Sequence, residues 1–394
     1  MAQKRKESTK NKATVNKATV GLLLGGRSSE HEVSLTSAAS VLHEIDRSRF
    51  DVVPILITRE GNWFLIENDN FLSAHLSQIT PAPAYATTSL TPVILDYCHG
   101  HKLIALPTKS ESTGVATSTS LPRKLDVIFP ILHGPYGEDG TVQGLCDMAQ
   151  IPCVGAGILG SACGLDKVAM KAIFAHQGLP ILPYHHFTVA QWQKQRQEAI
   201  AETKRKLQLP VFVKPANCGS SVGISKVAAW DCLEAAIDHA FRFDRKVVIE
   251  QGISVRELEC AVLGNDFPQA SVVGEIISLR EFYDYEAKYS EGKSKTVIPA
   301  DITEAQAKEI RELAIQAFCS LDCAGFSRID CFMDKASGKI YLNEINTIPG
   351  FTPKSMFPTL WQQSGIPYRD LITKLIELAM ERFAQNGQKS YSVV

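Results

Sequence analysis

Several features that would assign a chain to a specialised class of protein are missing from this sequence. No apolar run approaches the roughly 18–20 residues that a membrane-spanning helix needs. Acidic and basic residues almost cancel, with 42 Asp and Glu against 41 Lys and Arg, so charge gives no reason to expect a nucleic-acid or membrane partner. The ten cysteines are scattered without CxxC spacing. This argues against a disulfide framework or a zinc site and predicts reduced thiols in a cytoplasmic protein.

Two common nucleotide-binding signatures are missing as well. The glycine turn after the first apolar run is not GxGxxG, and the P-loop spelling GxxxxGK[ST] is absent, so neither motif assigns a nucleotide. What is present is a chain of 394 residues, 45% apolar and 21% charged, a composition typical of soluble globular proteins. That length exceeds one ordinary hydrophobic core, and two or three domains are expected.

A candidate β-hairpin lies toward the C-terminal end. Ser327–Met333 and Ile340–Ile345 are rich in β-branched and apolar residues, and the turn-forming run 334–338 lies between them. This is the pattern of two strands joined by a loop of about five residues. The expected register pairs Asp334 with Ile340.

That register predicts a polar face on the hairpin. Asp330 then faces Glu344 and Arg328 faces Asn346, and because strand side chains alternate, the four share one face. Two carboxylates directly opposite each other repel, and a hard cation resolves the conflict, since Asp, Glu and Asn oxygens are ligands of Mg²⁺. The alternative is a surface hairpin whose acids are balanced by Arg328.

The N-terminal part is typical of a doubly wound α/β domain. A buried strand from Ala18, a glycine turn at 25–32 and a helical pattern at 33–45 follow one another, and ligands of such domains bind at the carboxyl ends of the strands. Glu30 is either an N-terminal helix charge or an acid that positions a substrate amine. Residues 1–18 are polar and mostly basic, and we expect a disordered tail there.

A glycine- and serine-rich loop predicts an anion site in the middle of the chain. Lys214 ends the apolar strand 210–214, and the loop 215–223 follows it. Small residues such as Ser220 let backbone N–H groups close around phosphate oxygens. A lysine that enters an apolar strand requires a partner, and a nucleotide phosphate would supply one.

Three further loops carry residues of functional types. His133 lies in the loop that follows the strand 125–130, a position that commonly carries function. Residues 250–257 would line an adenine slot or form a solvated hinge. The run 281–290 is aromatic and charged without helical or strand periodicity, and we expect a lid that orders over a substrate.

Taken together, these segments resemble the D-alanine–D-alanine ligase family of ATP-grasp enzymes from residue 19 to about 385. The matching segments stand in the family's order: GGRSSEHEVSL, LHGPYGEDGTVQG, KPANCGSSVGISKV, FYDYEAKY, SRID and NEINTIPGFTPKS. The resemblance implies a three-domain α/β ATP-grasp fold with an N-terminal doubly wound domain. The expected boundaries are 1–18 for the tail, 19–157 for the N-terminal substrate domain, 158–253 for the central domain and 254–394 for the C-terminal domain with the lid and metal site.

The resemblance also implies a reaction. Two D-alanines are joined through an acylphosphate, with ATP converted to ADP and phosphate, to make a peptidoglycan precursor. ATP is the co-substrate, two Mg²⁺ ions are the cofactors, and Mn²⁺ is a possible substitute. A cytoplasmic homodimer without nucleic-acid or membrane partners is expected.

Site residues carry over from the family only where this sequence matches its motifs. The expected catalytic residues are Glu30, Ser220, Tyr289, Arg328 and Gly350. The expected substrate-binding residues are His133, Lys288, Ser355 and Met356. ATP would contact Lys167, Lys214, Glu250, Gln251, Ile253 and Glu257. The expected metal ligands are Asp330, Glu344 and Asn346.

Three rival interpretations remain open at this stage. One is a D-alanine–D-lactate ligase or another carboxylate–amine ligase with the same ATP site. Another is a nucleotide-binding regulatory module without catalysis, although the residues expected to bind metal are all present. A purely structural α/β protein would leave Lys214 and the acidic hairpin face unexplained.

Overall fold

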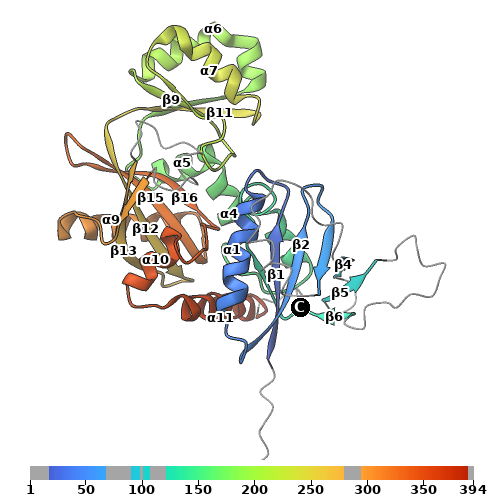
Figure 1. Cartoon of the computed structure of the whole chain (residues 1–394). Helices are drawn as coiled ribbons and strands as arrows, with labels where there is room; N and C mark the ends of the chain where they lie inside the picture. The colour runs from blue at the N-terminus through green and yellow to red at the C-terminus, as the bar shows by residue number, and fades with distance from the viewer. Residues whose placement is uncertain (1–16, 68–89, 98–100, 107–120, 279–293, 389–394) are drawn as a thin grey trace, which may run out of the picture.

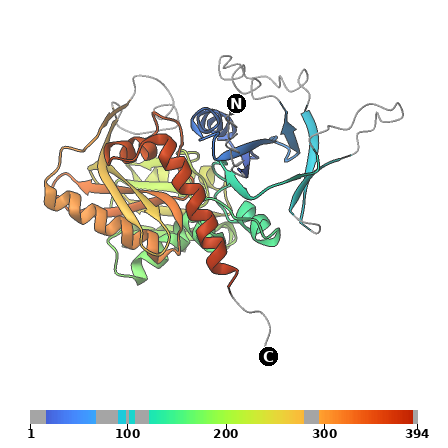
Figure 2. The same cartoon turned by 90° about the horizontal axis from the view of Figure 1, so that it is seen from below.

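A computed structural model describes residues 17–67, 90–97, 101–106, 121–278 and 294–388 of the chain (Figure 1). Its described residues form three β-sheets. In Figure 1 the N-terminal sheet lies at the right, the central sheet at the top and the C-terminal sheet at the left. Figure 2 shows the same arrangement from below, with the last helix running past both the N-terminal and the C-terminal part.

The N-terminal sheet is built from β1 (Ala18–Gly25), β2 (Phe50–Ile57), β3 (Trp63–Ile66), β4 (Leu90–Asp96), β5 (Lys102–Ala105), β6 (Arg123–Lys124) and β7 (Val127–Pro130). Strand β1 pairs in parallel with β2 and β7. Helix α1 (His31–Glu44) makes the crossover from β1 to β2 that a parallel pair requires. The strands β3 to β6 extend the sheet in antiparallel fashion, an extension that periodicity did not predict. Helix α3 (Thr141–Met148) follows β7.

The central part contains α4 (Ile158–Leu165), α5 (Lys167–His176), β8 (Tyr184–Thr188), α6 (Val189–Lys206), β9 (Val211–Pro215), β10 (Ser225–Val227), α7 (Leu233–Ala240) and β11 (Lys246–Gln251). The sheet order is β10-β9-β11-β8, and the pairs are antiparallel. Thr188 and Gln191 form a capping box that starts α6. Helices α6 and α7 cover the outer face (Figure 1), where Trp192 stacks on Phe187. The opposite face is directed toward the C-terminal part.

The C-terminal part contains β12 (Val255–Gly264), β13 (Gln269–Ser278), β14 (Ser294–Val297), α9 (Glu304–Ser320), β15 (Gly325–Asp334), β16 (Ile340–Asn346), α10 (Met356–Gln363) and α11 (Tyr368–Asn386). Its antiparallel sheet has the order β14-β13-β12-β15-β16. Helix α9 buries Ile310, Ala314 and Phe318, at helical spacing, in the core beneath the sheet.

The β15–β16 hairpin contains a β-bulge that the sequence did not reveal. Asp330 pairs with Glu344, but the next residue of β15 pairs with Leu342, so Asn343 is the extra residue of β16. The expected pairing of Asp334 with Ile340 is wrong, since Met333 occupies that place. The bulge is needed because a regular strand would put Leu342 on the same face as Glu344. With the bulge, Leu342 is buried at 1% exposure while Glu344 faces the opposite side.

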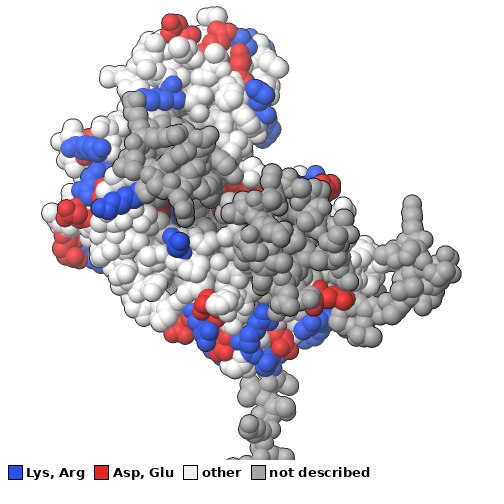
Figure 3. Space-filling model, viewed as in Figure 1, with Lys and Arg blue, Asp and Glu red and all other residues white. Residues whose placement is uncertain are grey.

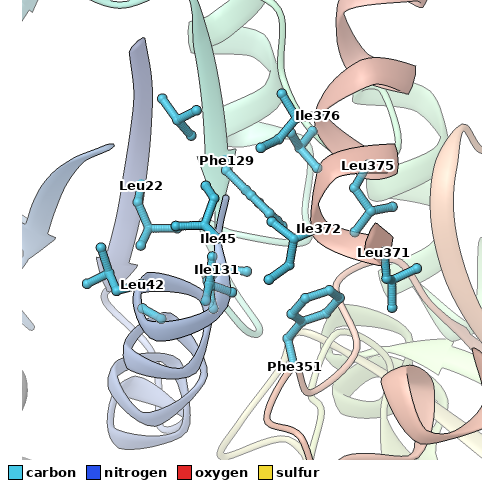
Figure 4. Close-up of a cluster of buried hydrophobic side chains, with 14 of the residues drawn as sticks. Leu22, Leu42, Ile45, Phe129, Ile131, Phe351, Leu371, Ile372, Leu375 and Ile376 are labelled. Carbon is cyan, nitrogen blue, oxygen red and sulfur yellow. The ribbon is translucent and has the colours of Figure 1, made fainter. Parts of the chain in front are cut away.

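The N-terminal and C-terminal parts share a hydrophobic core (Figure 4). Helix α11 presents one apolar face at helical spacing, and four of its residues are fully buried: Leu371, Ile372, Leu375 and Ile376. They pack with Phe129 and Ile131, which come from and just after β7. Burying side chains of this size stabilises the fold by about 1.5–3 kcal/mol each. This core fixes the loops of the N-terminal sheet against those that follow β16.

The surface of the described residues is mixed in charge. In Figure 3 acidic and basic side chains are interspersed on the visible face. Among the helices that the structure describes, none combines the length and apolar character needed to cross a bilayer. Nine cysteines in the described part are free thiols.

Candidate active site

A cavity of about 810 Å³ lies between the central and C-terminal sheets. Its walls come from β9, β11, β12, β15 and β16 and from the loop 218–221. The predicted site residues that line it are Lys167, Lys214, Ser220, Glu250, Gln251, Ile253, Glu257, Arg328, Asp330 and Glu344. A cavity of this size accommodates a ligand as large as a nucleotide.

The hairpin places its polar residues together as the sequence predicted. Asp330 pairs with Glu344, and Arg328 pairs with Asn346. The Asn346 side chain donates from Nδ2 to Asp330 Oδ2 at 3.0 Å. Both carboxylates line the cavity. Asn346 does not line the cavity itself, but it is bonded to Asp330, so two acids with a neighbouring amide offer the kind of oxygen ligands that magnesium takes.

Arg328 is buried beside these acids. Its guanidinium donates from Nε and Nη2 to the two carboxylate oxygens of Asp330, both at 2.7 Å. Nε also lies 2.9 Å from Glu259 Oε2. Burial alone would lower the pKa of Arg328, but the charges of Asp330 and Glu259 outweigh it and hold the pKa well above its usual value. Arg328 is thus a permanent cation in the cavity wall.

Lys167 reaches the same wall from the start of α5. Its Nζ lies 3.3 Å from Glu344 Oε2 and donates to the Cys218 carbonyl at 3.0 Å. Burial acts to lower the pKa of Lys167, but Glu344 raises it, and the net result is a raised pKa. The lysine is therefore charged and connects the acidic hairpin with the loop 218–221.

Lys214 and Glu250 form the centre of a buried charge cluster. Lys214 Nζ lies 2.6 Å from Glu250 Oε2, and Lys171 Nζ lies 2.8 Å from Oε1 of the same carboxylate. Burial opposes ionisation of Glu250, but the two lysines lower its pKa to about 2. The pKa of Lys171 is lowered by burial, with Lys214 adding to the effect. Two lysines against one acid favour an anionic ligand.

The remaining predicted nucleotide residues follow β11. Ile253 and Glu257 line the cavity. Gln251 also lines it, but its side chain is held by the backbone of Gln208, to which Nε2 donates and from which Oε1 accepts, each at 2.8 Å. Contact of these residues with adenine or ribose stays a prediction.

Glu30 joins the N-terminal part to the central loop. It precedes α1, as the sequence predicted, and the Ser220 hydroxyl donates to its carboxylate. A Cβ atom at Gly134 or at Gly219 would lie 3.0 Å from Glu30 Oε2, so glycine lets both loops approach the carboxylate closely. Ser220 has a φ of +49°, a strained conformation of the kind found at functional sites.

Gly350, Ser355 and His133 lie away from the lining of that cavity but close to one another in the fold. The Ser355 hydroxyl lies 3.2 Å from the Cβ position of Gly350, and Met356 begins α10 beside it. His133 Nδ1 contacts the carbonyl oxygen of Ile348 at 2.8 Å. His133 and Gly350 therefore belong to neighbouring loops. Lys288 and Tyr289, with the expected lid, lie outside the described residues.

Three charged residues near the site were missing from the sequence-based set. Lys171 lies one helical turn beyond Lys167, and this i, i+4 spacing was a signal for it. Glu259 follows Glu257 by two residues on β12, so strand alternation could have indicated it. Glu138 accepts from the backbone N–H groups of Gly134 and Ile348 at 2.8 and 3.0 Å. Burial and then the charge of Glu30 raise its pKa to about 7.

Comparisons with known proteins agree with this architecture. Family models described as D-ala D-ala ligase N-terminus and D-ala D-ala ligase C-terminus match residues 19–156 and 173–377. A D-alanine–D-alanine ligase of Geobacillus kaustophilus is 48% identical over 95% of this chain and 98% of the relative. One from Heliobacterium modesticaldum is 46% identical over 95% of this chain and 98% of the relative.

Solved structures give the same result at lower identity. The D-alanine-D-alanine ligase from Coxiella burnetii has a TM-score of 0.78 at 31% identity, covering 94% of this chain and 96% of that one. The VanG D-Ala:D-Ser ligase from Enterococcus faecalis has a TM-score of 0.78 at 34% identity, covering 92% and 100%. The chain belongs to the D-alanine–D-alanine ligase family of ATP-grasp proteins.

Proposed function

We propose that the chain joins two D-alanines to D-alanyl-D-alanine, with conversion of ATP to ADP and phosphate, for peptidoglycan precursor synthesis. The observation that carries this proposal is the match of both family models over nearly the whole chain, together with the charged cavity between two sheets. The reaction is an ATP-dependent ligation of a carboxylate to an amine.

The proposed chemistry has two steps. A carboxylate oxygen of the first D-alanine attacks the γ-phosphorus of ATP, and the bond from that phosphorus to ADP breaks, which gives an acylphosphate. The amine nitrogen of the second D-alanine attacks the acyl carbon. The resulting tetrahedral intermediate expels phosphate, and the nitrogen loses a proton. Such reactions depend on positioning and charge neutralisation more than on covalent work by the protein.

Residues on the two cavity walls are assigned to the first step. The Lys214, Lys171 and Glu250 cluster carries a net positive charge, so it suits ATP phosphates, and Lys167 suits them from the loop side. Glu30 would bind the ammonium group of the first D-alanine. Adenine and ribose would lie along the stretch 250–257.

Residues of the C-terminal part are assigned to the second step. Arg328, a permanent cation, would neutralise the acylphosphate and the intermediate. The Gly350 N–H would donate to the oxyanion. Ser355 and Met356 would place the second D-alanine. From the lid, Lys288 would contact the γ-phosphate and Tyr289 would close the site against Ser220.

The donor set fits a magnesium site. Asp330 and Glu344 would hold one Mg²⁺, and Glu344 with Asn346 a second, because these residues are neighbours in the pairing of β15 with β16. Mn²⁺ is the proposed substitute. Bound there, the ions would supply positive charge beside the phosphates. The two acids also have cationic neighbours, since Arg328 pairs with Asp330 and Lys167 with Glu344.

We also propose a cytoplasmic homodimer. Free thiols throughout the described part are consistent with a reducing compartment. Met148 and Leu159 are 75% and 57% exposed on the neighbouring helices α3 and α4, and a second copy of the chain would cover such apolar side chains. Light scattering at assay concentrations measures the mass, and a monomer would contradict the dimer.

The function is tested by ATP-dependent phosphate release with chromatography of the products. D-Alanine should release phosphate and give the dipeptide, and L-alanine should do neither. Mixtures of D-alanine with D-serine or D-lactate test the acceptor, which matters because one structural neighbour is a D-Ala:D-Ser ligase. Preferential formation of a D-alanyl-D-serine or D-lactate product would replace the proposed acceptor. Phosphate release without any condensation product would overturn the proposal.

A further inference from the structure

The segment 348–351 carries the Gly350 N–H and is held from the N-terminal part of the chain. Both backbone groups of Ile348 have partners there. Its N–H donates to Glu138 Oε1 at 3.0 Å, and its carbonyl accepts from His133 Nδ1 at 2.8 Å. Glu138 and His133, from one loop, thus bind the N–H and the carbonyl of Ile348. In sequence they are 210 and 215 residues away from it.

Phe351, on the other side of Gly350, is held as well. Its N–H donates to Ser37 Oγ on α1 at 3.3 Å, and its carbonyl accepts from the Tyr368 hydroxyl. Pro349 has no N–H. Gly350 is partly buried, and its N–H has no acceptor among the described residues, whereas the N–H and carbonyl groups of Ile348 and Phe351 are all paired. The backbone on either side is therefore held, while this N–H is left available to a ligand.

We propose that Glu138, His133 and Ser37 are positioning residues that hold the Gly350 N–H in place for the oxyanion of the tetrahedral intermediate. The inference rests on the proposed ligation. In this proposal the position of the Gly350 N–H, in the C-terminal part, is set by side chains of the N-terminal part. These side chains act through the backbone and do not contact the reacting atoms themselves. An oxyanion donor must be held in place before the reaction, because the stabilisation that it gives to the transition state depends on the direction of its N–H bond.

The hydrogen bonds of His133 and Ser37 allow only one assignment of donors and acceptors. A carbonyl oxygen can only accept, so the proton of His133 lies on Nδ1 toward Ile348. Ser37 Oγ accepts from the Phe351 N–H, which leaves its own hydrogen for His133 Nε2 at 3.5 Å. Ser37 is fully buried. The arrangement is a continuous chain of donors from Phe351 through Ser37 and His133 back to Ile348.

The Glu138 carboxylate makes the anchor sensitive to its charge. When ionised, it accepts from two N–H groups, on Gly134 and Ile348, and charge strengthens such bonds. Burial and then the charge of Glu30 oppose this ionisation, whereas the two backbone N–H groups and Arg328 favour it. Because the pKa of Glu138 is raised to about 7, the anchor is strong above that pH and weaker below it. Glutamine offers one acceptor oxygen in place of two.

The test compares Glu138→Gln with Asp139→Asn in the full-length chain. Asp139 is a matched control, because its carboxylate also accepts two backbone N–H groups, but both are local: Tyr136 in its own loop and Thr141 at the start of α3. Glu138→Gln should lower kcat for dipeptide formation by about 10- to 100-fold, with KM for ATP changed less than threefold. Asp139→Asn should lower kcat less than threefold. The ratio of wild-type to Glu138→Gln kcat should rise with pH through about 7 and then level off.

A second pair of variants tests the other anchor. Ser37→Ala removes the acceptor of the Phe351 N–H and should lower kcat about tenfold, while Ser37→Thr, which keeps a hydroxyl, should restore most of it. Thermal unfolding of each variant shows whether it is folded at the assay temperature, and only kcat of folded enzyme is compared.

Two results would overturn the proposal. One is a Glu138→Gln enzyme that behaves like Asp139→Asn at every pH. The other is a Ser37→Ala enzyme equal to Ser37→Thr. Both require an active wild type, so an inactive wild type would count against the proposed ligation instead.

Discussion

Replacing Lys171 by methionine should weaken the fold and ATP binding together. Lys171 is 1% exposed and its Nζ lies 2.8 Å from Glu250 Oε1. Methionine keeps the apolar length of the side chain but removes the charge. Glu250 would keep one cationic partner, Lys214 at 2.6 Å, and its pKa should rise from about 2.

The magnitude follows from the buried geometry. At an effective dielectric constant of about 20, two unit charges at this separation attract by about 6 kcal/mol. The variant also loses the desolvation cost of Lys171 and its repulsion from Lys214, and breaking a buried pair outright costs about 3–5 kcal/mol. Because Lys214 stays in place, we expect a net loss of about 2–3 kcal/mol. This corresponds to a fall in Tm of roughly 5 °C.

The effect on the ligand has a separate cause. Two lysines and one glutamate carry a net charge of +1, and the variant carries none, so the attraction for ATP phosphates falls. We expect KM for ATP to rise about tenfold, equivalent to about 1.4 kcal/mol. The assay is ligation at varied ATP, with differential scanning fluorimetry in parallel. Lys194→Met, at an exposed position of α6, is the control. If Lys171→Met matched this control in both KM and Tm, the charge-cluster reasoning would be refuted.

Three further predictions concern the metal site, acid stability and the lid. Glu344→Gln should abolish ligation because it weakens a ligand shared by both Mg²⁺ sites, whereas Asp330→Asn should recover partly at high Mg²⁺; full activity of Glu344→Gln at ordinary Mg²⁺ would remove the metal assignment. The folded pKa of Glu250 is about 2 against an ordinary 4.5, so its contribution is present above about pH 4.5 and is lost as pH falls toward 2. The loss of Tm caused by Glu250→Gln should therefore shrink across that range, while Glu377→Gln, in an exposed ion pair, should show little effect at any pH. Tyr289→His should lose dipeptide synthesis at low pH and gain D-alanyl-D-lactate there, measured as a product ratio from about pH 6 to 9; a ratio equal to wild type throughout would falsify its acceptor-site role.

The sequence predicted the core strands from their continuous apolar runs and the polar hairpin face from the alternation of strand side chains. Asp330 opposite Glu344 and Arg328 opposite Asn346 were confirmed. The bulge was missed, since a pairing rule that counts from the turn assumes a regular strand. The antiparallel strands β3 to β6 were missed because they are short and their apolar residues do not form long runs.

The chemistry of the site was only partly accessible to sequence reasoning. Glu30 and Ser220 were singled out from two separate loops, and the structure brings them into a direct hydrogen bond. Glu138 could not be evaluated in the same way, because its raised pKa depends on burial and on Glu30, which lies 108 positions earlier in the chain. The partners of Ile348 are likewise set by tertiary packing through the shared core.

The bulge at Asn343 divides the β15–β16 hairpin into two parts that can change independently. On the turn side of Asn343, Ile340 and Leu342 serve the hydrophobic core. On the other side, Glu344 and Asn346 belong to the polar face of the candidate metal site. All four positions are even-numbered, so in a regular strand they would share one face. Anyone who transplants this metal face onto another antiparallel scaffold must carry the extra residue with it. Without it, the borrowed carboxylates would share a face with the core side chains, and the host would lose either its packing or its ion.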